Sequence, residues 1–196
     1  MTTLRHAART LRANPGFALV AMLTLALGIG VNTAVFSVVH GTLLRRLPYV
    51  EPERLVMPTA VNSDGRYASV TYADYLDWRE LRDLFRAVAV FSTGAVNLAG
   101  EGQAERVEAA LVSDGFFDVL GVRPLLGRQF QPAEHAAAAP GVAILSRGLW
   151  QRRFGGDPAI LGRTIRVNGA ATEVVGVMPD QARWPRETTL WRPIPI

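Results

Sequence analysis

The sequence predicts an α+β domain that is preceded by one transmembrane α-helix. Two observations carry this prediction. Residues 17–44 contain no Asp, Glu, Lys or Arg, and this run is longer than the ~20 apolar residues that cross a bilayer. All 17 acidic residues lie at or beyond Glu51, where short strand and helix patterns begin and follow one another without regular alternation.

The chain has 196 residues and contains neither cysteine nor lysine. The lack of cysteine excludes a disulfide framework, a thiolate zinc site and a cysteine nucleophile. The lack of lysine excludes a phosphate-loop lysine and a Schiff-base lysine. The chain by itself is therefore not a Walker-type ATPase.

The formal net charge of +4 is concentrated near the N-terminus. Five of the 21 arginines flank the apolar run, at Arg5, Arg9, Arg12, Arg45 and Arg46. The other arginines nearly balance the 17 acidic residues, which does not favour a basic face for nucleic acid. We expect the lipid bilayer as a partner, and no nucleic acid, because arginines beside a membrane segment meet lipid headgroups and set its topology.

Residues 1–14 are predicted to form a short basic amphipathic helix. Apolar residues recur there at helical spacing, at Leu4, Ala7, Ala8 and Leu11. The three arginines of this stretch fall on another face, which suits a helix lying on lipid headgroups; a frayed, solvated N-terminus is the alternative. Three arginines precede the apolar run and two follow it, which favours a cytoplasmic N-terminus.

Residues 15–45 are predicted to be the transmembrane helix, with Pro15 in its first turn. The charge-free run spans roughly 42 Å at 1.5 Å per residue, so we expect the helix to tilt or to project beyond the hydrocarbon core. A cleaved signal peptide is the alternative. Signal peptides have apolar cores of about 7–15 residues, and the LLRRLP that ends this run is a poor cleavage site.

A stripe of small residues runs along the predicted membrane helix. Ala26, Gly30 and Ala34 are spaced by four residues, and Thr33 and Ser37 lie beside them. Small residues allow a second helix to approach closely, so this stripe is predicted to be a helix-packing site. Chance is the alternative, because Gly and Ala are common in membrane helices.

Residues 46–196 are predicted to form the extracytoplasmic α+β domain. Strands are predicted at 54–57, 87–92, 104–112, 142–145, 164–167 and 171–178. The last two strands are joined by Asn168-Gly169, and Asn-Gly between two alternating apolar runs predicts a type I′ hairpin.

Three helices are predicted in this domain, each from a capping residue. Thr71 is expected to cap a helix that continues to residue 85, with apolar positions at Tyr72, Tyr75, Leu76, Leu81 and Leu84. Asp114 is expected to cap a short helix that ends at Gly121. Ser146 is expected to cap a third helix, which Gly155 ends.

The sequence predicts no catalytic, cofactor-binding or metal-binding residue, and no enzyme. His6, His40 and His135 are not at metal-ligand spacing. Ser146 lies outside a nucleophile elbow. Four carboxylates at spacing three are interpreted as a solvated helix face, namely Asp74, Asp77, Glu80 and Asp83. The tryptophans are expected to pack in the core or at an interface instead of lining a ligand site, and they are Trp78, Trp150, Trp184 and Trp191.

Longer strings resemble a known family. ALGIGVNTAVFSVVHGTLLRRLPYVEPERLV resembles the first membrane helix and exit segment of MacB/FtsX-type ABC transporter permeases, and it is especially similar to the duplicated orphan permeases of acidobacteria. Further strings are similar to the family's periplasmic core domain in the same order: YADYLDWRE, AERVEAALVSDGFFDVLGVRPLLGRQF, VAILSRGLWQRRFGGDPAILGRTIRVNG, VVGVMP and LWRPIPI. The resemblance covers nearly the whole chain.

The resemblance implies a component of an ABC-type transport or mechanotransmission system in the bacterial inner membrane. Such permeases have four membrane helices, or eight when duplicated, with the large extracytoplasmic domain between the first two. The implied partners are a cytoplasmic ABC ATPase subunit and other permease helices or a second permease copy. The implied role is export or lipoprotein handling, and no cofactor or catalytic residue is carried over.

The chain stops at WRPIPI, inside the family's core domain, so the resemblance leads us to expect a truncated permease. The layout of one helix and one domain also fits a second hypothesis, a single-pass, membrane-anchored binding or interaction module. A membrane-anchored enzyme is a third hypothesis, which has only scattered acids and serines to support it.

Overall fold

The computed structural model describes residues 13–39, 49, 51–100, 102–182, 184–185 and 187–195. The chain divides into two compact units, Met1–Leu47 and Pro48–Ile196, which are described separately below. Most of the amphipathic helix predicted at residues 1–14 falls outside the described residues, and so does the stretch 40–45 of the predicted membrane helix.

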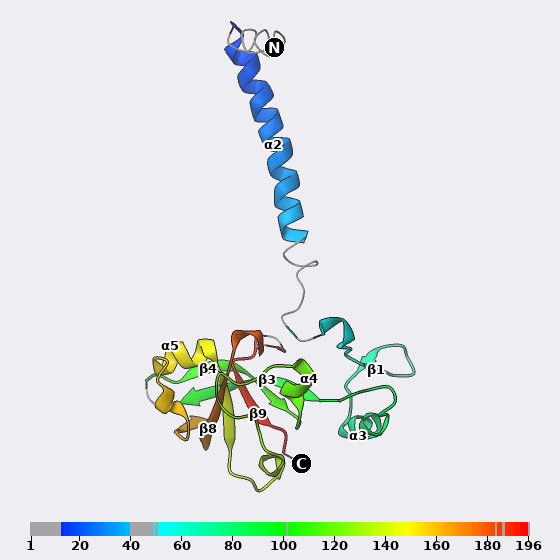
Figure 1. The fold of residues 1–196 in the computed structure, drawn as a ribbon, viewed down its shortest axis with the longest axis vertical. Helices are drawn as coiled ribbons and strands as arrows, with labels where there is room; N and C mark the ends of the chain where they lie inside the picture. The colour runs from blue at the N-terminus through cyan, green and yellow to red at the C-terminus, as the bar shows by residue number, and fades with distance from the viewer. Residues whose placement is uncertain are drawn as a thin grey trace. The chain divides into compact units, whose positions relative to one another are not determined.

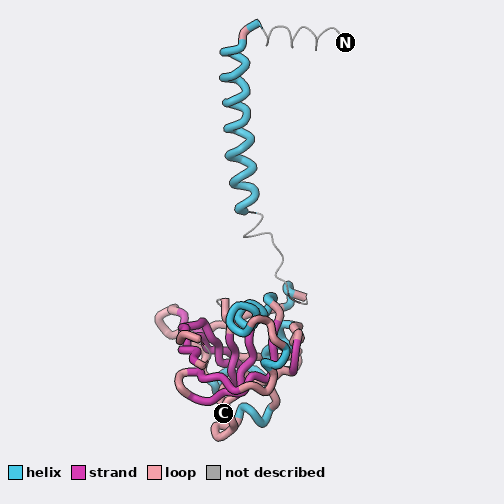
Figure 2. Tube along the Cα trace, turned by 90° about the vertical axis from the view of Figure 1, so that its left-hand side faces the viewer, coloured by secondary structure: helices cyan, strands magenta, loops and turns pink. Residues whose placement is uncertain are grey.

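The first unit contains one long helix, α2 (Pro15–Val39). It begins at Pro15, as predicted, and the amide of Ala18 donates to the Asn14 carbonyl at 3.1 Å. The Thr24 hydroxyl donates to the Val20 carbonyl at 2.9 Å, which satisfies this polar group inside the helix. Both ribbon and tube show α2 as one continuous helix (Figure 1, Figure 2).

The second unit is an α+β domain built on one sheet of seven strands, which confirms the predicted fold class. Its strands are β3 (Phe91–Ala99), β4 (Glu105–Val112), β5 (Leu126–Gly127), β6 (Val142–Ser146), β7 (Thr164–Val167), β8 (Ala170–Met178) and β9 (Leu190–Pro193). A separate two-stranded ribbon pairs β1 (Ala60–Val61) with β2 (Tyr67–Ala68). The α-helices of this unit are α3 (Tyr72–Glu80), α4 (Phe116–Leu120) and α5 (Arg147–Phe154). Single 3₁₀ turns are η2 (Pro52–Arg54), η3 (Pro132–His135), η4 (Pro158–Ile160) and η5 (Asp180–Ala182).

The large sheet closes on itself through β8. Its strand order is β5-β8-β6-β9-β4-β3-β7, and β7 also pairs with β8. Glu173 of β8 is in register with Val142 of β6 on one side and with Thr164 of β7 on the other. Six strands therefore form a closed ring. Strand β5 is not part of the ring and pairs with β8. We call this ring and its covering elements, residues 91–193, the barrel.

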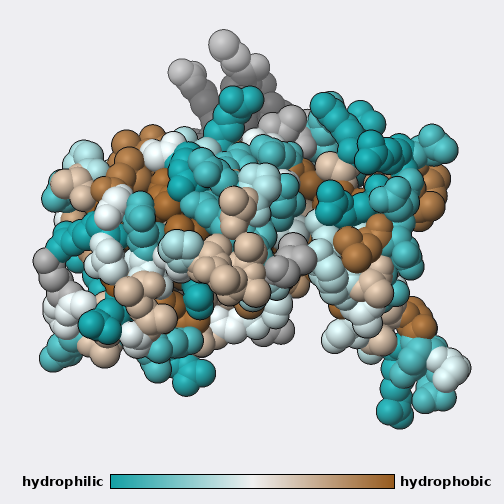
Figure 3. All heavy atoms as spheres, turned by 90° about the horizontal axis from the view of Figure 1, so that it is seen from below, coloured by the Kyte–Doolittle hydropathy of each residue, from teal (hydrophilic) through white to brown (hydrophobic). Residues whose placement is uncertain are grey.

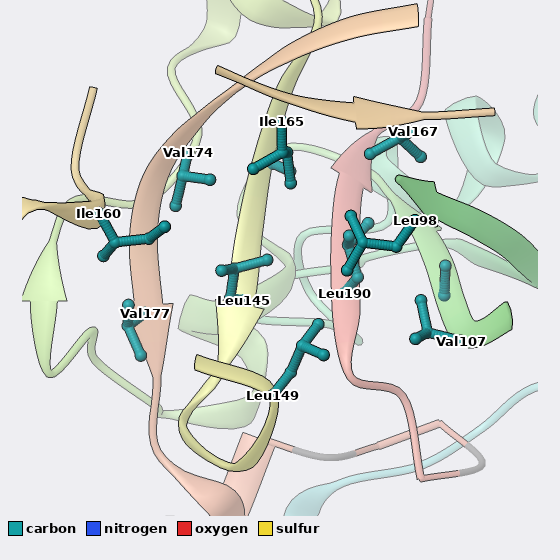
Figure 4. Close-up of a cluster of buried hydrophobic side chains, with 12 residues drawn as sticks. Leu98, Val107, Leu145, Leu149, Ile160, Ile165, Val167, Val174, Val177 and Leu190 are labelled. Atoms are coloured by element: carbon teal, nitrogen blue, oxygen red, sulfur yellow. The ribbon is translucent and has the colours of Figure 1, made fainter. Parts of the chain in front are cut away.

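One hydrophobic cluster fills the inside of the ring (Figure 4). Side chains from six strands meet there with Leu149 of α5 and Ile160 of η4, and Figure 4 shows them pointing toward one another. The strand residues are Leu98, Val107, Ala109, Ala143, Leu145, Ile165, Val167, Val174, Val177 and Leu190. Leu98, Leu145 and Leu149 are fully buried, so this cluster is the core inside the ring.

A second cluster covers the other face of β4, β6, β8 and β9, where α4 packs. Trp191 is its largest fully buried side chain, and its ring meets Phe117 at a centroid distance of 5.7 Å. The burial of β6 on both faces follows from the two clusters: Ala143 and Leu145 enter the first and Val142 and Ile144 the second. Such a strand has a continuous apolar sequence instead of an alternating one.

Several predicted elements are confirmed in the barrel. The hairpin between β7 and β8 turns at Asn168 and Gly169, whose φ angles of 50° and 82° are both positive, as a type I′ turn requires. The Ser146 hydroxyl accepts from the Leu149 amide at 3.1 Å and caps α5, which Gly155 ends with φ 65°. Gly121 ends α4 in the same way, with φ 66°.

Other predictions were wrong, mostly upstream of the barrel. Residues 54–57 form no strand, because no neighbouring strand pairs with them; η2 occupies residues 52–54. The helix capped by Thr71 ends at Glu80 instead of residue 85. The strand predicted at 87–92 begins four residues later and continues to Ala99, as β3, which pairs with β4 along nearly its whole length. The N-cap of α4 is Gly115, with φ 72°, and not Asp114.

Candidate membrane span and interaction surfaces

Helix α2 is a candidate transmembrane span. The apolar stretch Pro15–Ser37 has 23 residues, and none of its most apolar window is buried in the described structure. Phe17 and Leu27 expose 72% and 70% of their surface. Burying such a side chain contributes about 1.5–3 kcal/mol, so a helix that is apolar all round is suited to lipid or to other helices, and not to water.

The predicted packing stripe lies on this helix. Ala26, Gly30 and Ala34 are all exposed in α2. A Cβ atom built on Gly30 meets nothing within 4 Å, and the same holds for Gly28. No described residue therefore occupies the stripe, and its role in helix packing stays a prediction.

Residues 51–86 precede the seven-stranded sheet in the second unit, and we call them the lobe. It contains η2, β1, β2 and α3. Eight large apolar side chains of the lobe are exposed, namely Val56, Met57, Val61, Tyr67, Tyr72, Leu76, Leu81 and Leu84. Brown, apolar side chains are visible on the projecting right-hand part of the domain in Figure 3. All apolar positions predicted for the helix at 72–85 are among these eight exposed side chains, except Tyr75.

Tyr75 is the one fully buried residue of the lobe, at 2% exposure. Its ring contacts Tyr72 at a centroid distance of 5.5 Å, and the Arg79 guanidinium lies 5.5 Å from its centroid. Thr71 and Asp74 form a reciprocal capping box: the Asp74 amide donates to the Thr71 hydroxyl and the Thr71 amide to the Asp74 carboxylate. The hydrogen bonds from the Thr71 hydroxyl and amide lower the pKa of Asp74. Asp77 and Glu80 are exposed on this helix, whereas Asp74 belongs to the capping box of Thr71.

An open surface hollow of about 420 Å³ lies beside α5 and the start of β4. Glu105 accepts from Arg152 at 2.6 Å and from Arg153 at 3.4 Å, and Arg153 also donates to the Gln103 carbonyl at 2.9 Å. No sequence motif indicates this group, because the two arginines lie some fifty residues from their partners. The Glu105 carboxylate already pairs with both guanidinium groups, so we assign no ligand to this hollow.

His135, Trp150 and Trp184 make contacts within the domain. The His135 ring is buried, its Nδ1 donates to the Ile194 carbonyl at 3.1 Å, and it meets Phe130 edge-on. The Trp150 indole donates to the Asp157 carbonyl at 2.9 Å, and Trp184 packs against Phe91. Among the described residues no three His, Asp or Glu side chains are grouped to hold a metal ion. His6 and His40 lie outside that part of the chain.

Comparison with known proteins identifies the domain. The model of the MacB-like periplasmic core domain matches residues 18–194. The extracellular domain of the non-canonical ABC-type transporter YknZ from Gram-positive bacteria has a similar fold, with a TM-score of 0.50 and 16% sequence identity over 62% of this chain and 61% of that domain. The chain thus spans about three fifths of that domain's length.

Two further solved structures match this chain with lower TM-scores. The periplasmic region of MacB from Actinobacillus actinomycetemcomitans gives a TM-score of 0.45 at 19% identity, covering 54% of this chain and 47% of that one. A domain of a putative permease from Porphyromonas gingivalis gives 0.41 at 22% identity, covering 55% and 50%. A search of functionally curated proteins found no match.

The similarity to the duplicated permeases of acidobacteria stays a prediction, because none of these matches reaches that subgroup. The family itself is settled by the extent of the first match, which runs from the candidate membrane span to the last strand of the barrel. The chain belongs to the family of the MacB-like periplasmic core domain, which is a domain of ABC-type transporter permeases.

Proposed function

We propose that this chain supplies the first membrane helix and part of the extracytoplasmic domain of an ABC-type permease. In this role it transmits movement between a cytoplasmic ATPase subunit and the extracytoplasmic side, for export or lipoprotein handling. One observation carries the proposal: a charge-free helix of 25 residues, apolar on all sides, precedes a MacB-like core domain in the same chain. The same chain therefore holds the family's domain and a helix that is long and apolar enough to cross a membrane.

The proposed location is the bacterial inner membrane, with the N-terminus in the cytoplasm and the domain outside. Three arginines precede the apolar run and two follow it, and the positive-inside rule places the more basic flank in the cytoplasm. The domain beyond the run carries nearly balanced charge, so it offers no competing signal.

The proposed membrane partners are other permease helices or a second permease copy, through which the ATPase subunit is coupled. Ala26, Gly30 and Ala34 support this proposal, because in lipid close packing of small residues replaces the hydrophobic effect as the force between helices. A helix that served only as an anchor would need no such stripe.

Topology is tested by single cysteine labels, since the native chain has no cysteine. Thr3→Cys and Ser63→Cys variants are expressed in bacteria, and spheroplasts are treated with a membrane-impermeant maleimide. The proposal predicts that Ser63→Cys reacts in intact spheroplasts, that Thr3→Cys reacts only after permeabilisation, and that the protein stays in the membrane after alkaline carbonate. Release by carbonate, or the reverse labelling pattern, contradicts it.

The stripe is tested by Gly30→Leu against Gly28→Leu. Both glycines are exposed on α2 without neighbours within 4 Å, but they lie on opposite sides of the helix. Gly30→Leu should weaken co-purification with the partner permease several-fold and leave membrane insertion intact, whereas Gly28→Leu should change neither. Equal co-purification of the two variants would favour the alternative function, a single-pass anchored interaction module.

A further inference from the structure

The turn between β7 and β8 carries an exposed Asn-Gly pair. The sequence has five asparagines, and Asn168 is the only one that a glycine follows. Both turn residues are exposed, and the Gly169 amide donates a hydrogen bond to no described residue. Glycine has no Cβ atom that would shield its backbone nitrogen. The Gly169 nitrogen is therefore free to approach the carbonyl carbon of the Asn168 side chain.

The geometry of this turn suits ring closure between the two groups. Two-residue hairpins use type I′ or type II′ turns, which differ by rotation of the central peptide plane. Both types need a positive φ at the first residue, and Asn168 has a φ of 50°. Gly169 tolerates either sign of φ, so the peptide plane can rotate without unpairing β7 from β8. In the type II′ form the ψ of Asn168 is about −120°, and a five-membered ring through its side chain and the Gly169 nitrogen requires this ψ.

The Asn97 amide lies where negative charge develops in such a reaction. Asn168 Oδ1 accepts from the Asn97 amide at 2.8 Å, and the Asn168 amide donates to the Asn97 carbonyl at 2.8 Å. Attack on the side-chain carbonyl turns Oδ1 into an oxyanion, which a backbone N–H at this distance stabilises. The same two bonds join the turn to β3, next to the pairing of Leu98 and Ala99 with β7. We call these contacts between β3 and the β7 side of the hairpin the seam of the ring.

We propose that Asn168 is a site of spontaneous deamidation in the folded domain, and that this modification weakens the seam. The Gly169 nitrogen loses its proton and bonds to Asn168 Cγ, the Cγ–Nδ2 bond breaks, and Nδ2 leaves as ammonia, which gives a succinimide. Water then adds to one of the two imide carbonyls and opens the ring. The product is aspartate or, where the chain now runs through the former side chain, isoaspartate. Water is the only co-reactant.

Isoaspartate alters the seam because it adds one carbon to the backbone of the turn. A turn of this length no longer fits between Val167 and Ala170, which are paired in the hairpin. The former side-chain carbonyl belongs to the main chain, so the two bonds between residue 168 and Asn97 are lost. Only the last two residues of β3 then hold it on β7. This modification acts on the ring itself and does not depend on the proposed transport role.

Peptide mapping of the full chain in detergent tests the site. The protein is incubated in mildly alkaline buffer, samples are digested with trypsin over time, and the zero-time sample corrects for modification during digestion. Fragment spectra assign the mass gain of an amide-to-acid change to a residue of peptide 167–183. The internal control is Asn62, an exposed asparagine that serine follows and whose Oδ1 also accepts backbone amides. Asn168 is expected to convert several-fold faster than Asn62, and equal or slower conversion overturns the proposal.

Two comparisons separate a reactive turn from a merely reactive dipeptide. Asn168 should convert in the folded chain at a rate within a few-fold of that in the urea-unfolded chain, because the hairpin accommodates the ring; strong protection in the folded chain overturns the proposal. Asn168→Gln requires a larger ring for the same attack. Conversion at this position should therefore fall several-fold, and unchanged conversion overturns the proposal.

Hydrogen exchange measures the effect on the seam. The Asn97 amide is compared in fresh chain and in chain whose residue 168 has been converted largely to isoaspartate. Exchange should be several-fold faster in the converted chain, because the amide has lost its acceptor, Asn168 Oδ1. Amides of β6, which pairs with β8 and β9, should exchange equally in the two samples. Unchanged exchange at Asn97 overturns the proposal that the modification weakens the seam.

Discussion

The barrel and the lobe differ in how much of their apolar surface they bury. The barrel encloses two hydrophobic clusters of twelve buried residues each, one inside the ring and one beneath α4. The lobe, with 36 residues between 51 and 86, buries only Tyr75 and exposes eight large apolar side chains. Both stretches have globular composition, so composition alone does not decide where a core forms.

The difference follows from strand pairing. In the barrel each strand has partners on one or both sides, which brings residues far apart in sequence to the same cluster. In the lobe the hydrogen bonds are local, such as the Asn62 side chain accepting from the Arg66 amide and the Thr71–Asp74 capping box. Apart from the buried Tyr75 and the half-buried Leu55, which packs against the cluster beneath α4, the lobe has few buried apolar contacts. Local hydrogen bonds with so few apolar contacts stabilise a segment weakly, so we expect the lobe to open far below the unfolding free energy of the barrel.

The largest expected effect is on the core beneath α4. Trp191→Ala removes a fully buried ring that contacts Phe117, and such truncations cost about 3–5 kcal/mol. Its counterpart is Leu84→Ala, which truncates a lobe side chain that is 74% exposed and should change stability by less than about 0.5 kcal/mol. Urea unfolding of the purified chain in detergent, followed by the fluorescence of the remaining tryptophans, measures both. Similar losses in the two variants would contradict the comparison.

A smaller effect is expected where β5 meets β8. A Cβ atom on Gly176 would lie 2.4 Å from the Arg128 carbonyl oxygen, and backbone cannot move aside as a side chain can. Gly176→Ala should therefore cost about 1–3 kcal/mol. The matched control is Gly94→Ala in β3, where a Cβ atom meets nothing within 4 Å. Unfolding midpoints of the two variants in the same detergent should differ clearly; a neutral Gly176→Ala would show that the approach of β5 to β8 is looser.

The smallest expected effect concerns acid stability at η3. Burial raises the pKa of Glu134, but hydrogen bonds from Arg128 and from the Gln131 amide outweigh it, so the pKa lies below its usual value of 4.5. The distance between Arg128 Nη2 and Glu134 Oε1 is 2.6 Å. A lowered acid pKa adds stability above the unfolded-state pKa, and this is lost as pH falls through the folded-state pKa.

Between pH 7 and pH 3 the wild type should therefore lose on the order of 1 kcal/mol more unfolding free energy than Glu134→Gln. The difference is small because Arg128 is partly solvated. Urea unfolding at both pH values measures the difference. Parallel losses in the two proteins would mean that this ion pair contributes nothing to folding.

Local signals in the sequence were sufficient where each element carries its own boundary. The β7–β8 hairpin, with Asn168-Gly169, and helix α5, between Ser146 and Gly155, were predicted correctly because the turn and cap residues require those conformations. The small-residue stripe at Ala26, Gly30 and Ala34 is equally readable, but no described contact tests it.

Tertiary context decided the rest. Residues 91–97 contain Gly94 and Asn97, which disfavour a strand prediction, yet they form β3 because β4 lies alongside. Leu55, Val56 and Met57 favour a strand but find no partner. Helix α3 ends at Glu80 because Leu81 and Leu84 have no core to pack on, and propensity alone does not extend a short helix. The ring also depends on non-local pairings, such as those of β3 with β7 and of β4 with β9, which no short sequence window contains.

Hydrogen exchange on the full chain in its membrane or detergent tests the central contrast most directly. Backbone amides of β4, β6 and β8 should exchange slowly, while those of residues 51–86 should exchange orders of magnitude faster, because their hydrogen bonds are exposed and almost no apolar contact holds them. Equal protection of the lobe and the barrel would contradict the account, because it would show that the lobe shares the stability of the closed sheet.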